Sequence, residues 1–349
     1  MRPLAWAALA AVLTACASPA QLPPGTAGSP PPFPSNAFPP VDPCADIPTP
    51  APYLDAHHPA PRIGAALAYD GQSRRLILFS GVRGDSSCEL AASWIFQDTW
   101  AWDGNGWTKL HPASSPLGRS FGAFAFDAHR GETVLFGGGS ANSDLPRLDT
   151  WVWDGTNWRL KRTLTYPSAP AGSATYDASL SGVVALTDRA WLWDGTNWAA
   201  MPGDVPTGAW QYALADDPAH HQLVLYGTFA RSTGTSYETW TWDGAAWQLR
   251  RPAHPPAAGT PYAAYDPVHN DVLMFDGATY SWNGVDWTQE HPAISPRPRL
   301  FASMAYDAAI GRIVLFGGKS VDRDAAGQYT ETVNNELWSW DGASWHLER

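Results

Sequence analysis

Three arginines at matching places in the chain could hold a charged ligand. Arg62, Arg119 and Arg299 each stand directly before a segment of small residues that is expected to form a strand. A guanidinium presents planar, forked donors that suit a carboxylate or a hydroxyl-rich molecule. The two longest loops, 81–97 and 318–335, belong to the same repeated segments as Arg62 and Arg299, and loops on a rigid scaffold commonly carry recognition. We predict a ligand-binding site with these contact residues: Arg62, Arg83, Arg119, Arg299, Asp322, Arg323 and Tyr329.

Two other interpretations of these residues stay open. The arginines could pair with local carboxylates or cap strand ends, since structural ion pairs are common. A sugar-processing enzyme would need a general acid or base within reach of the bound sugar. Glu89 and Asp322 are available for that role, but nothing in the sequence marks either one. No catalytic residue is therefore predicted.

No cofactor or metal ion is expected. Asp322, Asp324 and Gly327 match positions one, three and six of a calcium loop. Val333 stands where such a loop needs its bidentate glutamate, so a solvated acidic loop is the better interpretation. The 10 histidines form no HExxH motif and no cluster with cysteine.

The scaffold that must position these residues is a repeat. The motif Trp-Asp-Gly-x-x-Trp occurs six times, once with Asn in place of Asp. Its copies start at Trp102, Trp153, Trp193, Trp242, Trp282 and Trp340. Successive copies start 40 to 58 residues apart. A period in that range with strand-like flanks is typical of a β-propeller.

Each unit has the pattern of four antiparallel strands. A strand of small residues ends at an acidic turn, as at 212–216 in the fourth unit, and a short apolar run follows. After a glycine and a loop, the third strand carries Trp100 and Trp102, which share one face because they are two residues apart. Asp103-Gly104 then predicts a hairpin, and Trp107 returns on the fourth strand. We expect these indoles to contact the neighbouring unit.

The order of these features resembles the kelch repeat, the class to which the propeller of galactose oxidase belongs. An arginine precedes the first strand, a glycine doublet such as Gly137-Gly138 follows the second, and aromatic residues come at fixed offsets. The resemblance is weaker at Thr187-Asp188-Arg189 in the third unit and at Asp276-Gly277 in the fifth. It implies blades that run from an inner to an outer strand. Some bacterial kelch propellers interconvert the anomers of acidic sugars.

We therefore predict an all-β fold, a six-bladed kelch-type β-propeller over residues 62–349 with four antiparallel strands per blade. Each unit begins with its inner strand, so the ring is expected to close by packing of the last unit against the first. The predicted blades are 62–114, 115–168, 169–206, 207–256, 257–296 and 297–349.

The N-terminal segment has the pattern of an export signal. Arg2 precedes an apolar run over 4–15 that is too short for a stable spanning helix. Leu13-Thr14-Ala15-Cys16 resembles the bacterial lipobox, which implies a lipoprotein signal peptide over 1–15 and a lipid on Cys16. An ordinary cleaved signal is the alternative. Residues 16–61 are rich in Pro, Ala and Ser, as in a linker.

Cysteine usage fits an exported protein. The chain has 3 cysteines, so lipidation of Cys16 leaves Cys44 and Cys88 as a pair. Exported compartments permit disulfides, and we expect these two residues to bond. The expected location is therefore the cell envelope, outside the cytoplasm, with a membrane anchor.

Charge and fold narrow the function to three classes. The formal net charge of −11 argues against nucleic-acid binding, which needs a basic surface. We predict a non-enzymatic binding propeller for a protein, peptide or glycan. The alternatives are a sugar-processing enzyme, such as a mutarotase acting on an acidic sugar, and a structural factor in envelope assembly.

Overall fold

Strands make up all the regular secondary structure in the part of the chain that can be described. The computed structural model describes residues 57–83, 95–139, 146–169, 172–206, 208–256, 259–323 and 329–348. The elements in these ranges are β-strands, which confirms the all-β prediction. No helix among these residues is long and apolar enough to cross a membrane. They belong to one compact unit, Asp46–Arg349.

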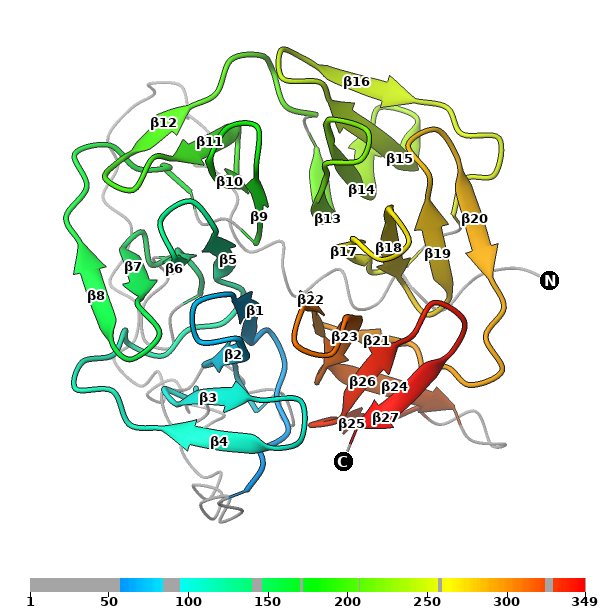
Figure 1. Cartoon of the computed structure of the whole chain (residues 1–349). Coiled ribbons are helices and arrows are strands. Elements are labelled where there is room, and N and C mark those ends of the chain that lie inside the picture. The colour runs from blue at the N-terminus through cyan, green and yellow to red at the C-terminus, as the bar shows by residue number, and fades with distance from the viewer. Residues whose placement is uncertain are drawn as a thin grey trace, which may run out of the picture. The chain divides into compact units, whose positions relative to one another are not determined.

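Antiparallel four-stranded sheets follow one another along the chain (Figure 1). The first sheet contains β1 (Ala66–Asp70), β2 (Arg75–Phe79), β3 (Thr99–Trp102) and β4 (Trp107–Leu110). The second contains β5 (Ala123–Asp127), β6 (Glu132–Phe136), β7 (Thr150–Trp153) and β8 (Trp158–Lys161). The third contains β9 (Ser173–Asp177), β10 (Gly182–Leu186), β11 (Ala190–Trp193) and β12 (Trp198–Ala200).

Three more sheets of the same kind complete the series. The fourth contains β13 (Ala209–Asp217), β14 (Gln222–Arg231), β15 (Gly234–Trp242) and β16 (Trp247–Arg250). The fifth contains β17 (Tyr262–Asp266), β18 (Asp271–Phe275), β19 (Thr279–Trp282) and β20 (Trp287–Glu290). The sixth contains β22 (Ser303–Asp307), β23 (Arg312–Phe316), β26 (Leu337–Trp340) and β27 (Trp345–Glu348).

A small seventh sheet forms where a long loop was expected. It contains β21 (Arg299–Leu300), β24 (Lys319–Arg323) and β25 (Tyr329–Val333). The segment expected as a loop over 318–335 is therefore partly a hairpin, with Asp322 paired to Thr330. The alternating Thr and Glu residues of β25 permit a strand, but no apolar face signals one in the sequence.

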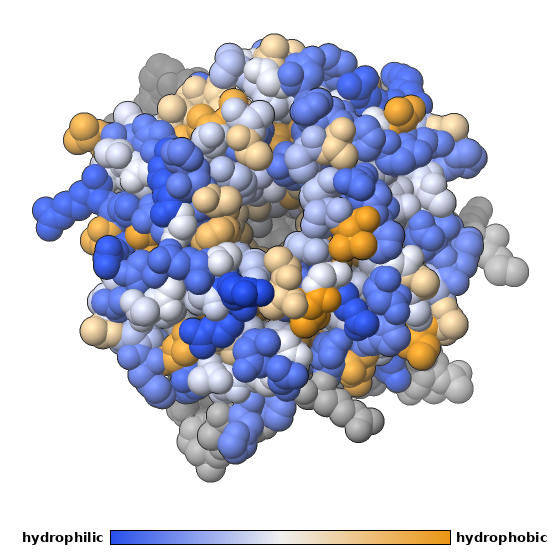
Figure 2. All heavy atoms as spheres, viewed as in Figure 1, coloured by the Kyte–Doolittle hydropathy of each residue, from blue (hydrophilic) through white to orange (hydrophobic). Residues whose placement is uncertain are grey.

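The first strands of the six larger sheets contact one another in a ring. β1 contacts β5, and the contacts continue through β9, β13 and β17 to β22, which contacts β1. Figure 1 shows these strands near the centre and the fourth strands of the sheets at the edge. From the same side, the surface is mostly polar with a hollow at its centre (Figure 2). This arrangement is consistent with a β-propeller.

The last sheet packs against the first, as expected. Arg62 N donates a hydrogen bond to Asn334 O at 3.1 Å, and Gly318 N donates to Arg62 O at 3.0 Å. The ring centroids of Trp107 and Phe316 lie 5.4 Å apart across the same junction. The first and sixth sheets are thus joined by both main-chain hydrogen bonds and aromatic packing.

The Asp-Gly pairs of the repeated motif form the turns between third and fourth strands. Asp103 Oδ1 accepts hydrogen bonds from the main-chain N of Asn105 at 2.9 Å and of Gly106 at 3.0 Å. Gly104 has a φ of 94°, which is strained for residues with a Cβ. Local sequence therefore determines this turn, as the motif predicted.

The predicted contact of the tryptophans with neighbouring sheets is confirmed. Trp158 Nε1 of the second sheet donates to Thr99 Oγ1 of the first at 3.0 Å, and both groups are buried. The same bond joins three further pairs of sheets: Trp198 to Thr150, Trp287 to Thr239 and Trp345 to Thr279. The third sheet has Ala190 at the threonine position. The buried Nε1 of Trp247 in the fourth sheet correspondingly has no partner among the described residues.

The first strand of the fourth sheet ends at Asp217, one residue later than expected. Asp217 is fully buried, and its carboxylate contacts His220 Nδ1 at 2.8 Å. Asp266 of the fifth sheet binds His269 in the same way. The expected end at Asp216 was wrong. Asp216 and Asp217 are adjacent, so the sequence alone does not show which of them caps the turn, and the contact with His220 identifies Asp217.

Candidate functional site

Arg62 is held by four hydrogen bonds to nearby acceptors. Its side chain is buried, with 1% exposure. Nε donates to Ala60 O at 3.0 Å, and Nη1 donates to Ser80 O at 2.9 Å. Nη1 and Nη2 donate to the two carboxylate oxygens of Asp98 at 2.7 and 2.9 Å. The guanidinium also lies 4.1 Å from the ring centroid of Phe96.

Asp98 joins this arginine to the third strand of the same sheet. Its Oδ2 accepts a hydrogen bond from Trp100 Nε1 at 2.7 Å. Burial alone would raise the pKa of Asp98. The ion pair with Arg62 and the indole hydrogen bond nevertheless hold this pKa below its ordinary value. The pair is therefore charged and fixes β3 to the segment before β1.

The second and sixth sheets repeat this clamp. Arg119 donates to Gly137 O at 2.9 Å and to Asp149 Oδ1 at 2.7 Å. Arg299 donates to Gly317 O at 3.0 Å and to Glu336 Oε2 at 3.0 Å. Both carboxylates accept an indole hydrogen bond from the tryptophan two residues later, Trp151 and Trp338. The ion-pair interpretation raised from the sequence is thus confirmed for all three arginines, and ligand contact by them stays a prediction.

The other predicted contact residues lie on β24 and β25 or directly after Val82. Asp322 lies on β24, and its carboxylate pairs with the exposed Arg297 at 2.7 Å. Arg323 and Tyr329 are opposite one another at the end of the β24–β25 hairpin. Arg83 follows Val82, which forms an isolated bridge with Ile63. Six of the candidate residues named from the sequence lie outside the described ranges: Cys16, Cys44, Cys88, Glu89, Asp324 and Gly327.

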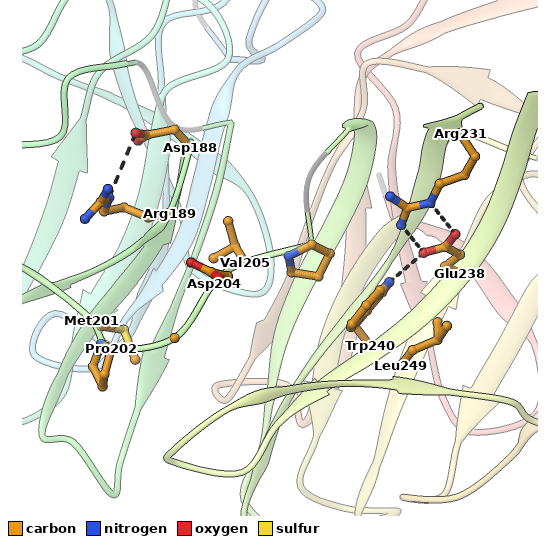
Figure 3. Close-up of a pocket in the computed structure, with 12 residues that line it drawn as sticks. Asp188, Arg189, Met201, Pro202, Asp204, Val205, Arg231, Glu238, Trp240 and Leu249 are labelled. Carbon is orange, nitrogen blue, oxygen red and sulfur yellow. Dashed lines mark hydrogen bonds and ion pairs between the residues drawn. The ribbon is translucent and has the colours of Figure 1, made fainter.

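A cavity of about 810 Å³ lies between the third and fourth sheets, away from the three clamps. The link 201–206, which joins β12 to the next sheet, lines it. Figure 3 shows Asp188 and Arg189 on one side of it, and Arg231, Glu238 and Trp240 on the other. The third sheet leaves this space open because β10 and β11 are joined only by the tight turn over 187–189, where Thr187 N donates to Arg189 O.

The wall from the fourth sheet is a connected polar network. Glu238 pairs with Arg231, whose Nε donates to Oε1 at 2.8 Å. Ser236 Oγ and Trp240 Nε1 also donate to the Glu238 carboxylate, at 2.6 and 2.8 Å. These bonds, led by that from Arg231, lower the pKa of Glu238 to about 2. The lengthened β14–β15 hairpin carries this network.

The wall from the third sheet is more loosely held. Arg189 Nε lies 3.9 Å from Asp188 Oδ2, and the two side chains are 54% and 53% exposed. Thr187 Oγ1 donates to Asp188 at 2.6 Å. This bond contributes most to lowering the pKa of Asp188. The described residues contain no group of three His, Cys, Asp or Glu side chains that could hold a metal ion.

Sequence reasoning did not identify this cavity. The signal was present at Thr187-Asp188-Arg189, where the third unit departs from the glycine doublet. That departure weakened the resemblance to the kelch repeat. Whether it leaves a cavity depends on the neighbouring β14–β15 hairpin, which forms the other wall. The β14–β15 hairpin is longer than its counterparts and ends where Arg231 pairs with Gly234. Glu238 pairs with Gly227, and the Arg231 side chain reaches along the hairpin to the Glu238 carboxylate.

Comparison with known proteins supports the fold. No family model matches the chain, and no curated protein matches it. A solved structure described as "Structure of YjhT" is similar, with a TM-score of 0.54 and 12% sequence identity. The similarity covers 84% of this chain and 99% of that one. At this identity the likeness concerns the fold alone, and it is consistent with a β-propeller.

Proposed function

We propose that the chain is a six-bladed kelch-type β-propeller, with each four-stranded sheet forming one blade. The ring of first strands and the Asp-Gly turns support this assignment. The glycine pairs Gly137-Gly138 and Gly317-Gly318 have positive φ and follow β6 and β23, at the place where the kelch pattern has them. The small β21–β24–β25 sheet is an elaboration of the sixth blade.

The propeller acts as a non-enzymatic binding protein for a protein, peptide or glycan. The observation that carries this proposal is the cavity between the third and fourth sheets. Its volume of about 810 Å³ falls in the range of ligand sites. Charged side chains of both signs and the apolar residues Met201, Val205 and Leu249 line it. Such a lining can orient a ligand by its charges and bury its apolar parts.

Two carboxylates of the cavity, those of Glu238 and Asp188, are suited to binding more than to proton transfer. A general acid or base works best when its pKa lies near the working pH. The pKa of Glu238 is about 2, and that of Asp188 is also lowered. Both groups are therefore ionised at neutral pH. This favours binding over the sugar-processing alternative at this cavity.

A matched pair of leucines tests the cavity as a binding site. Leu249 lines the cavity at the third position of β16, and Leu160 holds the same position on β8. Both side chains are exposed, at 39% and 51%. The full chain is screened against peptide and glycan arrays. Leu249→Arg should lower the affinity for the best-binding ligands at least tenfold, while Leu160→Arg should leave it unchanged. Equal binding by both variants would contradict the proposal.

The proposed location is the cell envelope, with a membrane anchor at Cys16. The lipobox-like Leu13-Thr14-Ala15-Cys16 behind an apolar run supports this proposal. Mass spectrometry of the mature N-terminal peptide should find a lipid on Cys16, and Cys16→Ala should move the protein from the membrane pellet to the supernatant. Retention of that variant in the pellet would contradict the anchor.

A disulfide between Cys44 and Cys88 is part of the same proposal. These are the two cysteines that remain after lipidation, and exported compartments permit their oxidation. Thiol labelling of the mature protein should modify neither residue until a reductant is added. Labelling of both without reductant would contradict the bond.

A further inference from the structure

In four of the six larger sheets, a carboxylate stands two residues before the first tryptophan of the third strand. This position precedes Trp100, Trp151, Trp240 and Trp338 by two residues, and the residues that occupy it are Asp98, Asp149, Glu238 and Glu336. Each of these carboxylates accepts an indole hydrogen bond from that tryptophan. Each also pairs with an arginine of its own sheet or of the segment before it.

The third sheet carries the opposite charge at this position. Arg189 stands two residues before Trp191, and the indole donates to Thr187 Oγ1 at 3.2 Å instead. Arg189 forms an ion pair with the adjacent Asp188, but the 3.9 Å between Nε and Oδ2 is longer than a hydrogen bond. The clamp arginines are almost fully buried, whereas the Arg189 side chain is 54% exposed. The exposed guanidinium of Arg189 can therefore donate hydrogen bonds to a ligand, whereas the donors of Arg62 are used within the protein.

We propose that Arg189 is the anion-binding residue of the cavity and that the ligand is a peptide segment with an acidic side chain. This inference rests on the proposed binding function and specifies its ligand. A guanidinium can grip a carboxylate with two parallel hydrogen bonds. Glu238 lies across the cavity from Arg189 (Figure 3), but its charge is paired with that of Arg231. The Arg189 side chain is 54% exposed, against 30% for Arg231 and 12% for Glu238, so Arg189 is the more accessible charge.

A polypeptide matches this lining better than a neutral glycan. Arg189 would take an acidic side chain, and Asp204 would attract a basic or hydrogen-bond-donating group. Met201 and Leu249 add apolar surface between the charged walls. A peptide supplies charges of both signs and apolar groups within a few residues. A neutral sugar supplies only hydroxyl groups, which can accept hydrogen bonds from Arg189 but leave Asp188, 3.9 Å away, as its counter-charge.

Matched peptide arrays test the inference. The full chain is applied to hexapeptides with a fixed central Glu, Gln or Lys and varied flanking residues, and to a glycan array. Wild-type protein should bind the best Glu peptides at least tenfold more tightly than their Gln counterparts. Arg189→Gln should abolish that preference, and Arg189→Glu should shift it to the Lys peptides. Arg297→Gln is the control, because Arg297 is exposed and pairs with Asp322 outside the cavity.

The outcomes separate this inference from the function on which it rests. Equal binding of Glu and Gln peptides, or an unchanged preference in Arg189→Gln, would overturn the role of Arg189. Glycan binding that Leu249→Arg abolishes, without any peptide binding, would overturn the peptide ligand while leaving the cavity as a binding site. Folding of each variant is checked by its near-ultraviolet circular dichroism, which the many buried tryptophans make sensitive to packing.

Discussion

Trp158 Nε1 donates a 3.0 Å hydrogen bond to Thr99 Oγ1 across the junction of two sheets. The two residues lie on β8 and β3. The indole belongs to the repeated motif, and the threonine begins the third strand of the preceding sheet. This pairing gives four of the junctions between neighbouring sheets a specific polar contact within otherwise apolar packing. It also makes the alignment of neighbouring sheets sensitive to a single hydroxyl group.

Replacing Thr99 by Val should destabilise the protein by about 1–3 kcal/mol. The shape of the side chain is kept, but the buried Trp158 Nε1 loses its acceptor, and an unsatisfied buried donor costs that amount. Urea denaturation followed by fluorescence measures the change. Thr330→Val on β25 is the control, because Thr330 is exposed, and its midpoint should stay near that of the wild type. An equal loss in both variants would contradict the role of this bond.

Replacing Arg62 by Gln should cost about 3–5 kcal/mol of unfolding free energy. The substitution leaves the Asp98 carboxylate partly buried without its cation, and breaking a buried pair has that magnitude. Arg297→Gln removes an exposed pair with Asp322 and should cost less than about 1 kcal/mol. A small effect of Arg62→Gln would argue against a structural clamp and favour the predicted ligand contact.

Two glycines of the repeated motif should respond differently to Ala. Both have positive φ, 94° at Gly195 and 93° at Gly244. A Cβ at Gly244 meets nothing within 4 Å, so Gly244→Ala should cost only the backbone strain, about 1–2 kcal/mol. A Cβ at Gly195 would overlap the Arg130 side chain, which is bonded to Asp127. Gly195→Ala should therefore be the more destabilising variant in thermal unfolding, and an equal loss would contradict this explanation.

Asp216 should make stability fall between about pH 4 and pH 7. Burial, followed by the nearby Asp177 and Asp217, raises its pKa from 3.8 to about 7. A raised folded-state pKa means that the group's contribution is complete below the unfolded pKa and is lost as the pH rises through the folded one. Asp216→Asn should remove this loss and stabilise the protein by about 1–3 kcal/mol at pH 8.

Thermal unfolding of both proteins at several pH values checks this prediction. The difference between variant and wild type should be smallest near pH 4 and should grow as the pH rises to 8. A difference that does not depend on pH would show that Asp216 does not titrate in this window.

Local sequence was sufficient for the repeated strands and their Asp-Gly turns, but not for the β24–β25 hairpin. The alternation of Trp100 and Trp102 and the Asp103-Gly104 pair are signals within a few residues, and the structure places them as predicted. The contact of the tryptophans with the neighbouring sheet was also predictable, because a large apolar side chain on a strand must be buried against something. The end of β13 was not, since either Asp216 or Asp217 could cap the turn.

The use of each arginine was decided by tertiary structure. Sequence identified Arg62 as a guanidinium at the start of a strand, but Asp98 is 36 residues away, and only the pairing of strands brings the two together. The same holds for the cavity, where Arg189 and Glu238 belong to different sheets. The sequence by itself determined the repeating elements, because hydrogen bonding and side-chain alternation act over short range. The partners that neutralise the three clamp arginines lie far along the chain. Only the folded ring therefore determines which charged side chains are paired and which are accessible to a ligand.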